Sequence, residues 1–189
     1  YSYGGRGYGK TDKEKLKDKD KKQGVYGYWS HDSKKFVFTR TDSRHIEDLW
    51  VIHSTKKGRP QLETYKYHMA GEQDFYKYEM LVFDIPSKSK KEIQLDSTTQ
   101  QTISIYSYPR MKSDRRDEHN PTKLLSKKGK IYFSTVSRDR KRLDIHVADI
   151  ASGEVRTIIE EHSNVYIENR GKTLTLFNNE QEILFLSER

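Results

Sequence analysis

The sequence predicts an all-β fold, a partial β-propeller of about four antiparallel blades, from three observations. Three stretches repeat one pattern of polar turn, short β-rich strand and charged loop, and a second strand follows in the two complete copies. Phe133 and Phe185 are 52 residues apart, and Phe38 and Phe133 are 95 apart, close to twice that spacing. Periods of roughly 40 to 50 residues are typical of propeller blades. No stretch keeps a 3.6-residue apolar period beyond a turn or two.

The expected strands are short runs bounded by polar or glycine-containing turns. They are residues 36–41, 49–54, 64–69, 78–85, 92–95, 102–107, 130–135, 143–150, 154–159, 165–167, 173–177 and 183–186. We expect the first two to pair with each other around the polar residues 42–48. Residues 130–159 predict a meander whose last turn, Ala151-Ser152-Gly153, has glycine where a tight hairpin needs a positive φ. In its middle strand Leu143, Ile145 and Val147 should share one face.

Composition favours narrow blades over one large core. Only 32% of the residues are hydrophobic and 34% are charged, while 13 tyrosines and seven phenylalanines supply much of the apolar mass. Aromatic residues suit the faces of sheets. The chain has no cysteine, which excludes disulfides, thiolate metal sites and cysteine nucleophiles. No run has the length of a transmembrane helix, the first residues are no signal peptide, and an initiator Met is lacking.

The 189 residues predict one propeller domain, residues 25–189, preceded by a flexible loop or terminus, residues 1–24. In residues 1–24 Leu16 is the only aliphatic side chain among glycine, tyrosine and alternating charges, too little apolar surface to order the segment. The formal net charge is +8, of which residues 10–22 carry +3. The remaining excess is scattered, so the charge does not predict nucleic-acid binding.

One stretch, Gly4 to Thr11, matches the phosphate-loop pattern G-x-x-x-x-G-K-[ST] letter for letter. A real phosphate loop needs a buried strand before it and a helix after it. Here three residues precede the stretch and a run of alternating charges follows. We therefore predict no nucleotide site and no cofactor. G-x-S-x-G and His-Glu-x-x-His patterns are absent as well, so no catalytic, cofactor-binding or metal-binding residue is predicted, and the substrate-binding residues stay open.

The histidines and the acid pairs are interpreted structurally. Adjacent residues on a strand point to opposite faces, so neither Glu160-Glu161 nor Glu47-Asp48 predicts a carboxylate dyad. Each histidine is expected to be solvated or to bond across strands, with His146 on the outward side of its strand. The seven histidines are dispersed along the chain, at His31, His45, His53, His68, His119, His146 and His162.

Four tyrosines, Tyr65, Tyr67, Tyr76 and Tyr78, admit two interpretations. They could form an aromatic stacking platform for a ligand. We prefer packing between blades, because aromatic residues must supply much of the core in this composition.

Several motifs occur in an order that resembles a known family. They are Trp29-Ser30-His31-Asp32-Ser33-Lys34-Lys35, Thr39-Arg40-Thr41-Asp42, the run from Arg59 to Glu72 that ends in Ala-Gly-Glu, the strand from Met80 to Asp84, Ser137-Arg138-Asp139-Arg140-Lys141 and Phe185-Leu186-Ser187-Glu188-Arg189. Together they resemble the N-terminal β-propeller of dipeptidyl peptidase IV-like serine peptidases of the prolyl oligopeptidase family. The resemblance covers about Tyr26 to Arg189.

The resemblance implies an eight-bladed propeller that covers an α/β-hydrolase domain carrying Ser, Asp and His. No such domain is in this chain, so the chain alone is expected not to hydrolyse peptides. Its expected partners are the parent's C-terminal hydrolase domain and peptide substrates. In dipeptidyl peptidases of the family, a Glu pair ahead of the Trp-Ser-x-Asp motif binds the substrate's amino terminus. Residues 1–24 contain only Glu14, which leaves dipeptidyl specificity of the parent open.

We therefore expect a non-catalytic propeller fragment that restricts substrate access to the hydrolase domain. The resemblance alone favours an extracytoplasmic setting. An incomplete ring would expose an apolar face or a strand edge at each end, so the fragment is expected to self-associate. The alternative is a stand-alone propeller-type module that binds a protein or another ligand, and a nucleotide or nucleic-acid binder is the second rival.

Overall fold

The computed structural model describes residues 25–55, 57–95, 101–109, 120–168 and 173–187. Within these residues it contains strands, one short 3-10 helix and no α-helix. The chain divides into two compact units. The smaller includes residues 40–77, and the larger comprises residues 27–39 and 78–189. The predicted loop of residues 1–24 lies outside the described residues.

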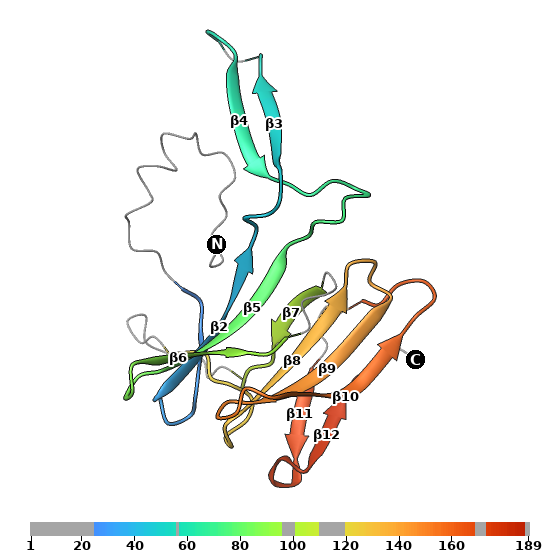
Figure 1. Cartoon of the computed structure of the whole chain (residues 1–189). Coiled ribbons are helices and arrows are strands. Elements are labelled where there is room, and N and C mark those ends of the chain that lie inside the picture. The colour runs from blue at the N-terminus through green and yellow to red at the C-terminus, as the bar shows by residue number, and fades with distance from the viewer. Residues whose placement is uncertain (1–24, 56, 96–100, 110–119, 169–172, 188–189) are drawn as a thin grey trace. The chain divides into compact units, whose positions relative to one another are not determined.

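The larger unit holds two four-stranded sheets and a hairpin (Figure 1). The first blade has the strand order β1 (Tyr28–Trp29), β2 (Lys35–Asp42), β5 (Lys77–Asp84) and β6 (Ser89–Ile93). The second blade is an antiparallel meander of β7 (Gln101–Ile105), β8 (Lys130–Ser137), β9 (Arg142–Asp149) and β10 (Val155–His162). The hairpin follows the two blades in the chain and is called the third hairpin. It pairs β11 (Leu174–Phe177) with β12 (Glu182–Phe185) through the 3-10 helix η1 (Asn178–Glu180).

Two apolar cores hold the larger unit together. The first contains buried side chains of the first and second blades, among them Val37, Met80, Ile131 and Phe133. The second contains side chains of the second blade and the third hairpin, among them Leu143, Ile145, Leu174 and Phe185. The second blade is therefore covered on both faces, as an inner blade of a propeller must be. The fold is an all-β partial propeller.

The phenylalanine spacing is explained by the place of each residue in its sheet. Phe38, Phe133 and Phe185 are each the fourth residue of a second strand, in β2, β8 and β12. Phe133 belongs to the core shared with the first blade, and Phe185 packs on the core shared with the second blade. The spacing of 52 residues is thus the repeat from one blade to the next. The spacing of 95 residues is longer because the first blade carries an insertion.

The insertion corrects one predicted pairing. Residues 36–41 do not pair with residues 49–54: β2 lies between β1 and β5, whereas β3 (Asp48–His53) pairs over its full length with β4 (Gln61–Lys66). Strands that follow each other in sequence usually pair, which favoured the wrong partner. Here a complete hairpin interrupts the first blade between β2 and β5. Four sheets result in the described residues, two of four strands and two of two.

A second correction concerns residues 165–167, which are not a strand. Ile167 is buried, but its backbone N–H donates to the carbonyl of Arg140 in a loop at 2.7 Å. A backbone hydrogen bond between two loops is thus found where the hydrogen-bond ladder of a strand was expected. The other predicted strands are present, with bounds shifted by up to three residues.

The meander of the second blade has the predicted faces and turn. Gly153 has a φ of +84°, the left-handed conformation that glycine adopts without strain. Leu143 and Ile145 lie in the second core with Val147 packed on it, whereas Ala148 belongs to the first core. The alternation therefore predicted which residues share a face of β9, although the face of Ala148 is buried as well.

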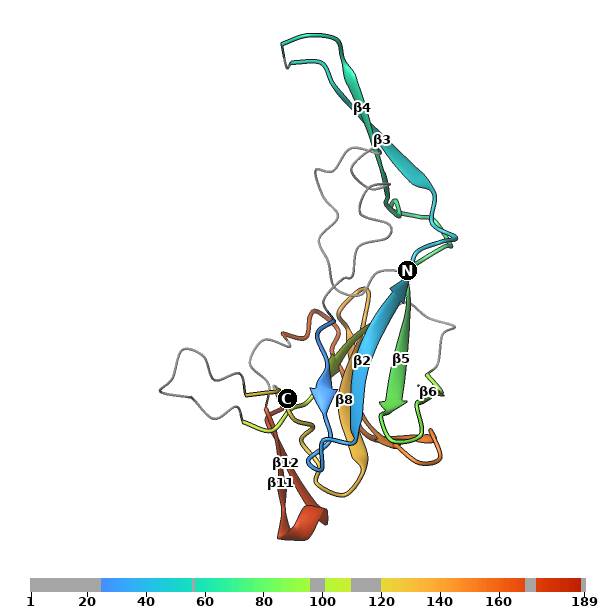
Figure 2. The same ribbon diagram turned by 90° about the vertical axis from the view of Figure 1, so that its left-hand side faces the viewer.

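The face of the first blade that is turned away from the second blade carries stacked aromatic rings. Figure 2 shows β1, β2, β5 and β6 side by side in this sheet. Neighbouring ring centroids lie 5.1–6.0 Å apart, a normal distance for aromatic pairs. The four rings are those of Trp29, Phe36, Phe38 and Phe83.

The smaller unit consists mainly of the inserted hairpin β3–β4. One face of this hairpin exposes apolar side chains: Trp50 is 70% exposed, and Ile52 and Leu62 pair directly across the two strands. At one end Lys66 forms an ion pair with Asp48 at 3.3 Å. Hairpins of two strands are marginal on their own, so neighbouring loops contribute to holding it.

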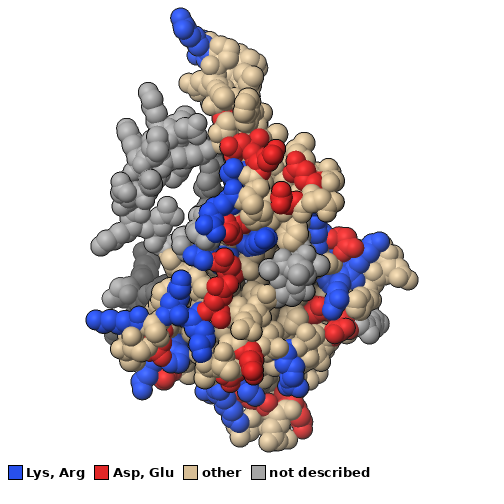
Figure 3. All heavy atoms as spheres, in the orientation of Figure 1, with Lys and Arg blue, Asp and Glu red and all other residues tan. Residues whose placement is uncertain are grey.

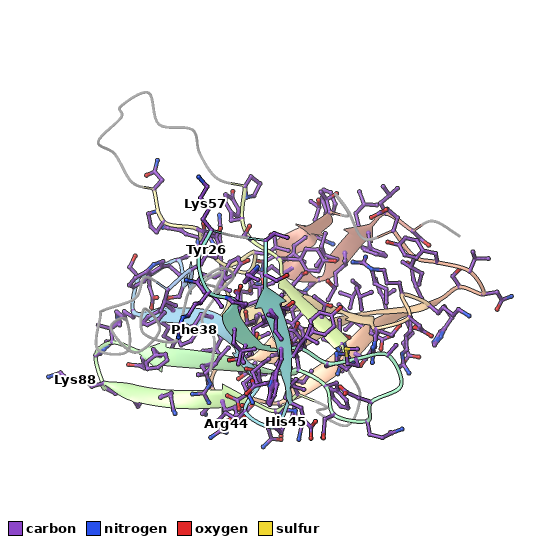
Figure 4. All side chains as sticks on the ribbon, turned by 90° about the horizontal axis from the view of Figure 1, so that it is seen from above. Tyr26, Phe38, Arg44, His45, Lys57 and Lys88 are labelled. Atoms are coloured by element: carbon purple, nitrogen blue, oxygen red, sulfur yellow. The ribbon has the colours of Figure 1, made fainter. Side chains whose placement is uncertain are left out.

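The loop that leads into β3 is fixed by charged bonds. Arg44, labelled with His45 in Figure 4, binds both carboxylate oxygens of Asp42, at 2.9 and 2.7 Å. This guanidinium holds the pKa of Asp42 well below its usual range. His45 contacts the carbonyl of Phe75 through Nε2 at 2.6 Å, and Ile46 is buried beside it in the chain. The predicted Thr-Arg-Thr-Asp motif therefore ends in a structural bond that starts the insertion.

Candidate functional site

The Trp-Ser-His-Asp motif forms a closed turn between β1 and β2. The hydroxyl of Ser30 donates to Asp32 at 2.6 Å and accepts the backbone N–H of Lys35 at 2.9 Å. Asp32 in turn accepts the N–H of Lys34 at 3.1 Å, and Ser33 has a φ of +58°. The bond from Ser30 is the largest cause of the lowered pKa of Asp32. The polar side chains of Ser30 and Asp32 therefore hold the turn closed.

The same turn recurs between β8 and β9. The hydroxyl of Ser137 donates to Asp139 at 2.6 Å and accepts the N–H of Arg142 at 3.0 Å. Lys141 donates its N–H to Asp139 at 3.1 Å, and Arg140 has a φ of +56°. The bonds and their lengths match those of the first turn. Both family-like motifs are therefore turn-forming sequences that position strands.

A third version of the turn borrows its carboxylate from the next hairpin. In the turn before β8, Ser126 accepts the N–H of Lys128 at 3.0 Å, and Gly129 has a φ of +69°. The carboxylate comes from Glu180, which accepts the Ser126 hydroxyl at 2.6 Å and the Lys127 N–H at 2.8 Å. This contact, the Ser126–Glu180 staple, fastens the third hairpin to the second blade.

The staple carries unusual backbone geometry. Asn178, Asn179 and Glu180 all have positive φ, at 47°, 56° and 66°. Such conformations cost free energy in residues other than glycine, so surrounding bonds must enforce them. One such hydrogen bond runs from the ammonium group of Lys128 to the carbonyl of Asn179, with an Nζ–O distance of 2.6 Å.

Beside the staple lies an open groove of about 840 Å³. Aromatic and aliphatic side chains, including Tyr106, Tyr108 and Leu176, form about half of its wall. The Nζ of Lys127 lies 5.3 Å from the centre of the Tyr108 ring, a cation–π distance. Apolar walls with few polar groups are typical of ligand-binding grooves. None of the described lining residues is a histidine or cysteine.

The histidines mostly serve as structural bonding groups. His146 and His53 bond across strands as predicted, His146 to Thr135 at 2.8 Å and His53 to Glu63 at 2.8 Å. His146 is half-buried and stacks on Phe133, so its side of the strand is interior and the prediction of an outward side was wrong.

Two further histidines contact backbone carbonyls of distant loops, a role the sequence did not indicate. His31 contacts the carbonyl of Leu124 at 2.9 Å, and His45 makes the contact with Phe75 described above. His68 lies edge-on to Tyr76, and His162 is exposed. His119 lies outside the described residues, as does the phosphate-loop match at residues 4–11.

The acid pair on β10 behaves as the alternation of strand residues predicts. Glu161 is buried while its neighbour Glu160 is exposed, which places them on opposite faces of β10. Strand pairing brings a different set together: carboxylate oxygens of Asp144 and Glu160 and a ring nitrogen of His162 lie within 4.8 Å of one another. Sequence inspection missed this set because its members come from two strands.

Three of the four tyrosines do not pack between blades. Tyr65, Tyr67 and Tyr76 belong to the smaller unit, where Tyr65 and Tyr67 meet edge to face and Tyr76 donates to the carbonyl of Lys66 at 2.7 Å. Tyr78 begins the first-blade part of β5, where burial raises its pKa. For Tyr65, Tyr67 and Tyr76 the interpretation as blade packing was wrong, because the insertion was not recognised.

Charges of both signs are interspersed over the face seen in Figure 3. Among the described residues no helix is long and apolar enough to cross a membrane.

Comparison with models of protein families shows to which family the chain belongs. The model of the dipeptidyl peptidase IV (DPP IV) N-terminal region matches residues 22–189. The chain belongs to this family. The predicted resemblance is confirmed, and the family accounts for the blades and their Ser-x-Asp turns. A comparison with curated protein sequences gives no significant match.

Solved structures share the fold of this DPP IV N-terminal region. Dipeptidyl peptidase 4 of Porphyromonas gingivalis aligns with a TM-score of 0.60 at 14% identity, over 88% of this chain and 24% of that chain. A Bacteroides ovatus protein named as a dipeptidyl aminopeptidase IV aligns with a TM-score of 0.59 at 14% identity, over 79% of this chain and 19% of that chain. The chain therefore spans about a quarter or less of the length of these similar structures.

Proposed function

We propose that this DPP IV N-terminal region is a non-catalytic propeller segment that restricts access of substrates to a C-terminal α/β-hydrolase domain of a serine peptidase. The observation that carries the proposal is the second blade, which is covered by apolar packing on both faces. Continuous packing of this kind makes a stiff wall. Family membership supports a peptidase as the parent.

Peptides and unfolded segments are the substrates that such a wall would admit. The groove beside Tyr108 and Lys127 has the volume of a small-ligand site and an aromatic wall, which suits a short extended segment. A folded domain is far larger than this groove. A groove of this size therefore supports restriction of substrates by size.

The proposal is tested in the intact protein that contains this chain. The rates of hydrolysis of a short chromogenic peptide and of a long unfolded polypeptide are compared between wild type and Phe133→Ala. Phe133 is fully buried between the blades, and its truncation costs about 3–5 kcal/mol, so the blades should part more often. We expect the rate for the long substrate to rise relative to that for the short peptide.

Ile85→Ala is the matched control, because Ile85 is half-exposed and its truncation leaves the blade interface intact. An unchanged ratio of the two rates in Phe133→Ala, with the protein shown to be folded by circular dichroism, would contradict the role in access.

A further inference from the structure

The ends of β9 and β10 place two carboxylates opposite each other. Asp144 pairs directly with Glu160, and Arg142 with His162, in the antiparallel register of these strands. Residues 142 and 144 share a face, as do 160 and 162, so all four side chains emerge on one side of the sheet. One donor atom from each of Asp144, Glu160 and His162 lies within 4.8 Å of the other two.

Asp144 is buried in a way that its protein contacts do not fully satisfy. Its side chain is only 10% exposed. Its Oδ2 accepts Nε of Arg142 at 2.7 Å, but Oδ1 is inaccessible and has no hydrogen-bond partner in the part of the chain that is described. A buried carboxylate oxygen without a partner is costly, so native proteins normally supply one. Oδ1 therefore indicates a missing ligand.

The charges around Asp144 also favour an added cation. Two carboxylates directly opposed on a sheet repel each other. Arg142 neutralises one of them, and its Nη2 is 3.8 Å from Oε2 of Glu160, too far for a hydrogen bond. With His162 neutral, the four side chains sum to one negative charge.

We propose that Asp144, Glu160 and His162 bind one divalent zinc ion. Two carboxylate oxygens and one imidazole nitrogen form a ligand set that zinc accepts, whereas magnesium and calcium prefer oxygen alone. Zinc ligands at about 2.0–2.2 Å in a tetrahedron lie about 3.3 Å apart, so the three donors, now within 4.8 Å of one another, must approach by up to about 1.5 Å. Glu160 and His162 are exposed and have room to rotate.

Arg142 then has the role of an outer-shell partner. Ligating carboxylates are themselves usually hydrogen-bonded, which fixes their orientation. Arg142 holds Oδ2 of Asp144 and leaves Oδ1 for the ion. Bound zinc joins the end of β10 to β9 beyond the bulge between Thr157 and Ile159, and water completes its coordination.

Calorimetric titration of the whole chain with zinc chloride tests the site. We expect one zinc ion per chain for wild type, at least a tenfold loss of affinity in Glu160→Gln and His162→Gln, and a thermal midpoint that rises with zinc in wild type alone. Both residues are exposed, so these variants should fold. Asp144→Asn is the third variant, with its fold checked by circular dichroism.

Glu154→Gln is the matched control, because Glu154 is exposed on the same meander and outside the cluster. It should bind zinc as wild type does, and magnesium chloride should give no heat of binding. Absence of zinc binding by wild type would overturn the proposal and leave Oδ1 to ordered water. Binding that persists in Glu160→Gln and His162→Gln would overturn it too, because the zinc would then be held elsewhere.

Discussion

At the scale of single residues, short polar turns decide where strands begin and end. Asp84, the last residue of β5, accepts the N–H of Ser87 at 3.0 Å and its hydroxyl at 2.9 Å, and it forms an ion pair with Lys35 of β2. Lys88, at the tip of this turn in Figure 4, has a φ of +52°. One carboxylate thus fixes both a turn and the neighbouring strand.

Asp84 predicts a specific loss of stability in acid. The Lys35 ammonium, with smaller contributions from the Ser87 bonds, lowers the pKa of Asp84 from 3.8 to about 2. A lowered folded-state pKa gives stability that is complete above pH 3.8 and is lost as the pH falls toward 2. Thermal midpoints measured from pH 6 to pH 2 should therefore fall more steeply below pH 4 in wild type than in Asp84→Asn.

Asp74→Asn serves as the control, since Asp74 is exposed and lies outside this sheet. If wild type and Asp84→Asn keep the same difference in midpoint from pH 6 to pH 2, Asp84 does not contribute as described.

Single residues also show what a sequence can and cannot indicate. The Ser-x-Asp turns at Ser30 and Ser137 were visible as motifs because all their groups lie within six residues. The zinc ligands were not visible. A β-bulge between Thr157 and Ile159 shifts the register, and only this shift sets Glu160 opposite Asp144. Bulges have no sequence signature strong enough to predict such a shift.

At the scale of elements, the third hairpin is held by a borrowed carboxylate. Glu180 replaces the aspartate that the first two turns carry in their own sequence, and its bonds to Ser126 and Lys127 cross from β11–β12 to the second blade. Three consecutive left-handed residues depend on these bonds. The hairpin should therefore be sensitive to loss of this single side chain.

Glu180→Ala should loosen the third hairpin without unfolding the chain. Losing two hydrogen bonds to a charged group costs about 2–4 kcal/mol, offset in part by relaxation of the left-handed residues. Hydrogen–deuterium exchange should show faster exchange in β11 and β12 and unchanged exchange in β5. Glu154→Ala, at an exposed position, is the control. Equal protection of β11 in wild type and Glu180→Ala would contradict the role of the staple.

The strands were largely predictable, and the pairing of the first blade was not. Alternation predicted which residues share a face of β9, but it did not show that the face expected to be outward packs on the first core. The prediction of strand pairing was wrong where a hairpin is inserted, because neither β2 nor β3 has a local sequence pattern that indicates its partner strand. For the same reason Tyr65, Tyr67 and Tyr76 were predicted to pack between blades, although they belong to the smaller unit.

At the scale of the whole molecule, both ends of the blade series carry apolar side chains, which are buried or partly buried on the first blade and exposed at β12. The first blade carries the aromatic face of Trp29, Phe36, Phe38 and Phe83. At the other end Leu184 and Leu186, in and after β12, are more than half exposed. Propeller blades normally cover such surfaces with neighbouring blades.

The isolated chain should therefore self-associate. Light scattering should give a mass above that of a monomer, and Leu184→Glu should lower it by placing a charge on the exposed end. Glu154→Gln should leave the mass unchanged. A clean monomer of wild type at high concentration would contradict this expectation.

The central claim is that this DPP IV N-terminal region works as the propeller segment of a serine peptidase. The reading frame downstream of Arg189 in the transcript tests it most directly. We expect the same reading frame to continue into a G-x-S-x-G motif followed by an Asp and a His, the order of an α/β-hydrolase. A stop codon without these residues would contradict the role as the propeller segment of a serine peptidase and would favour a stand-alone binding module.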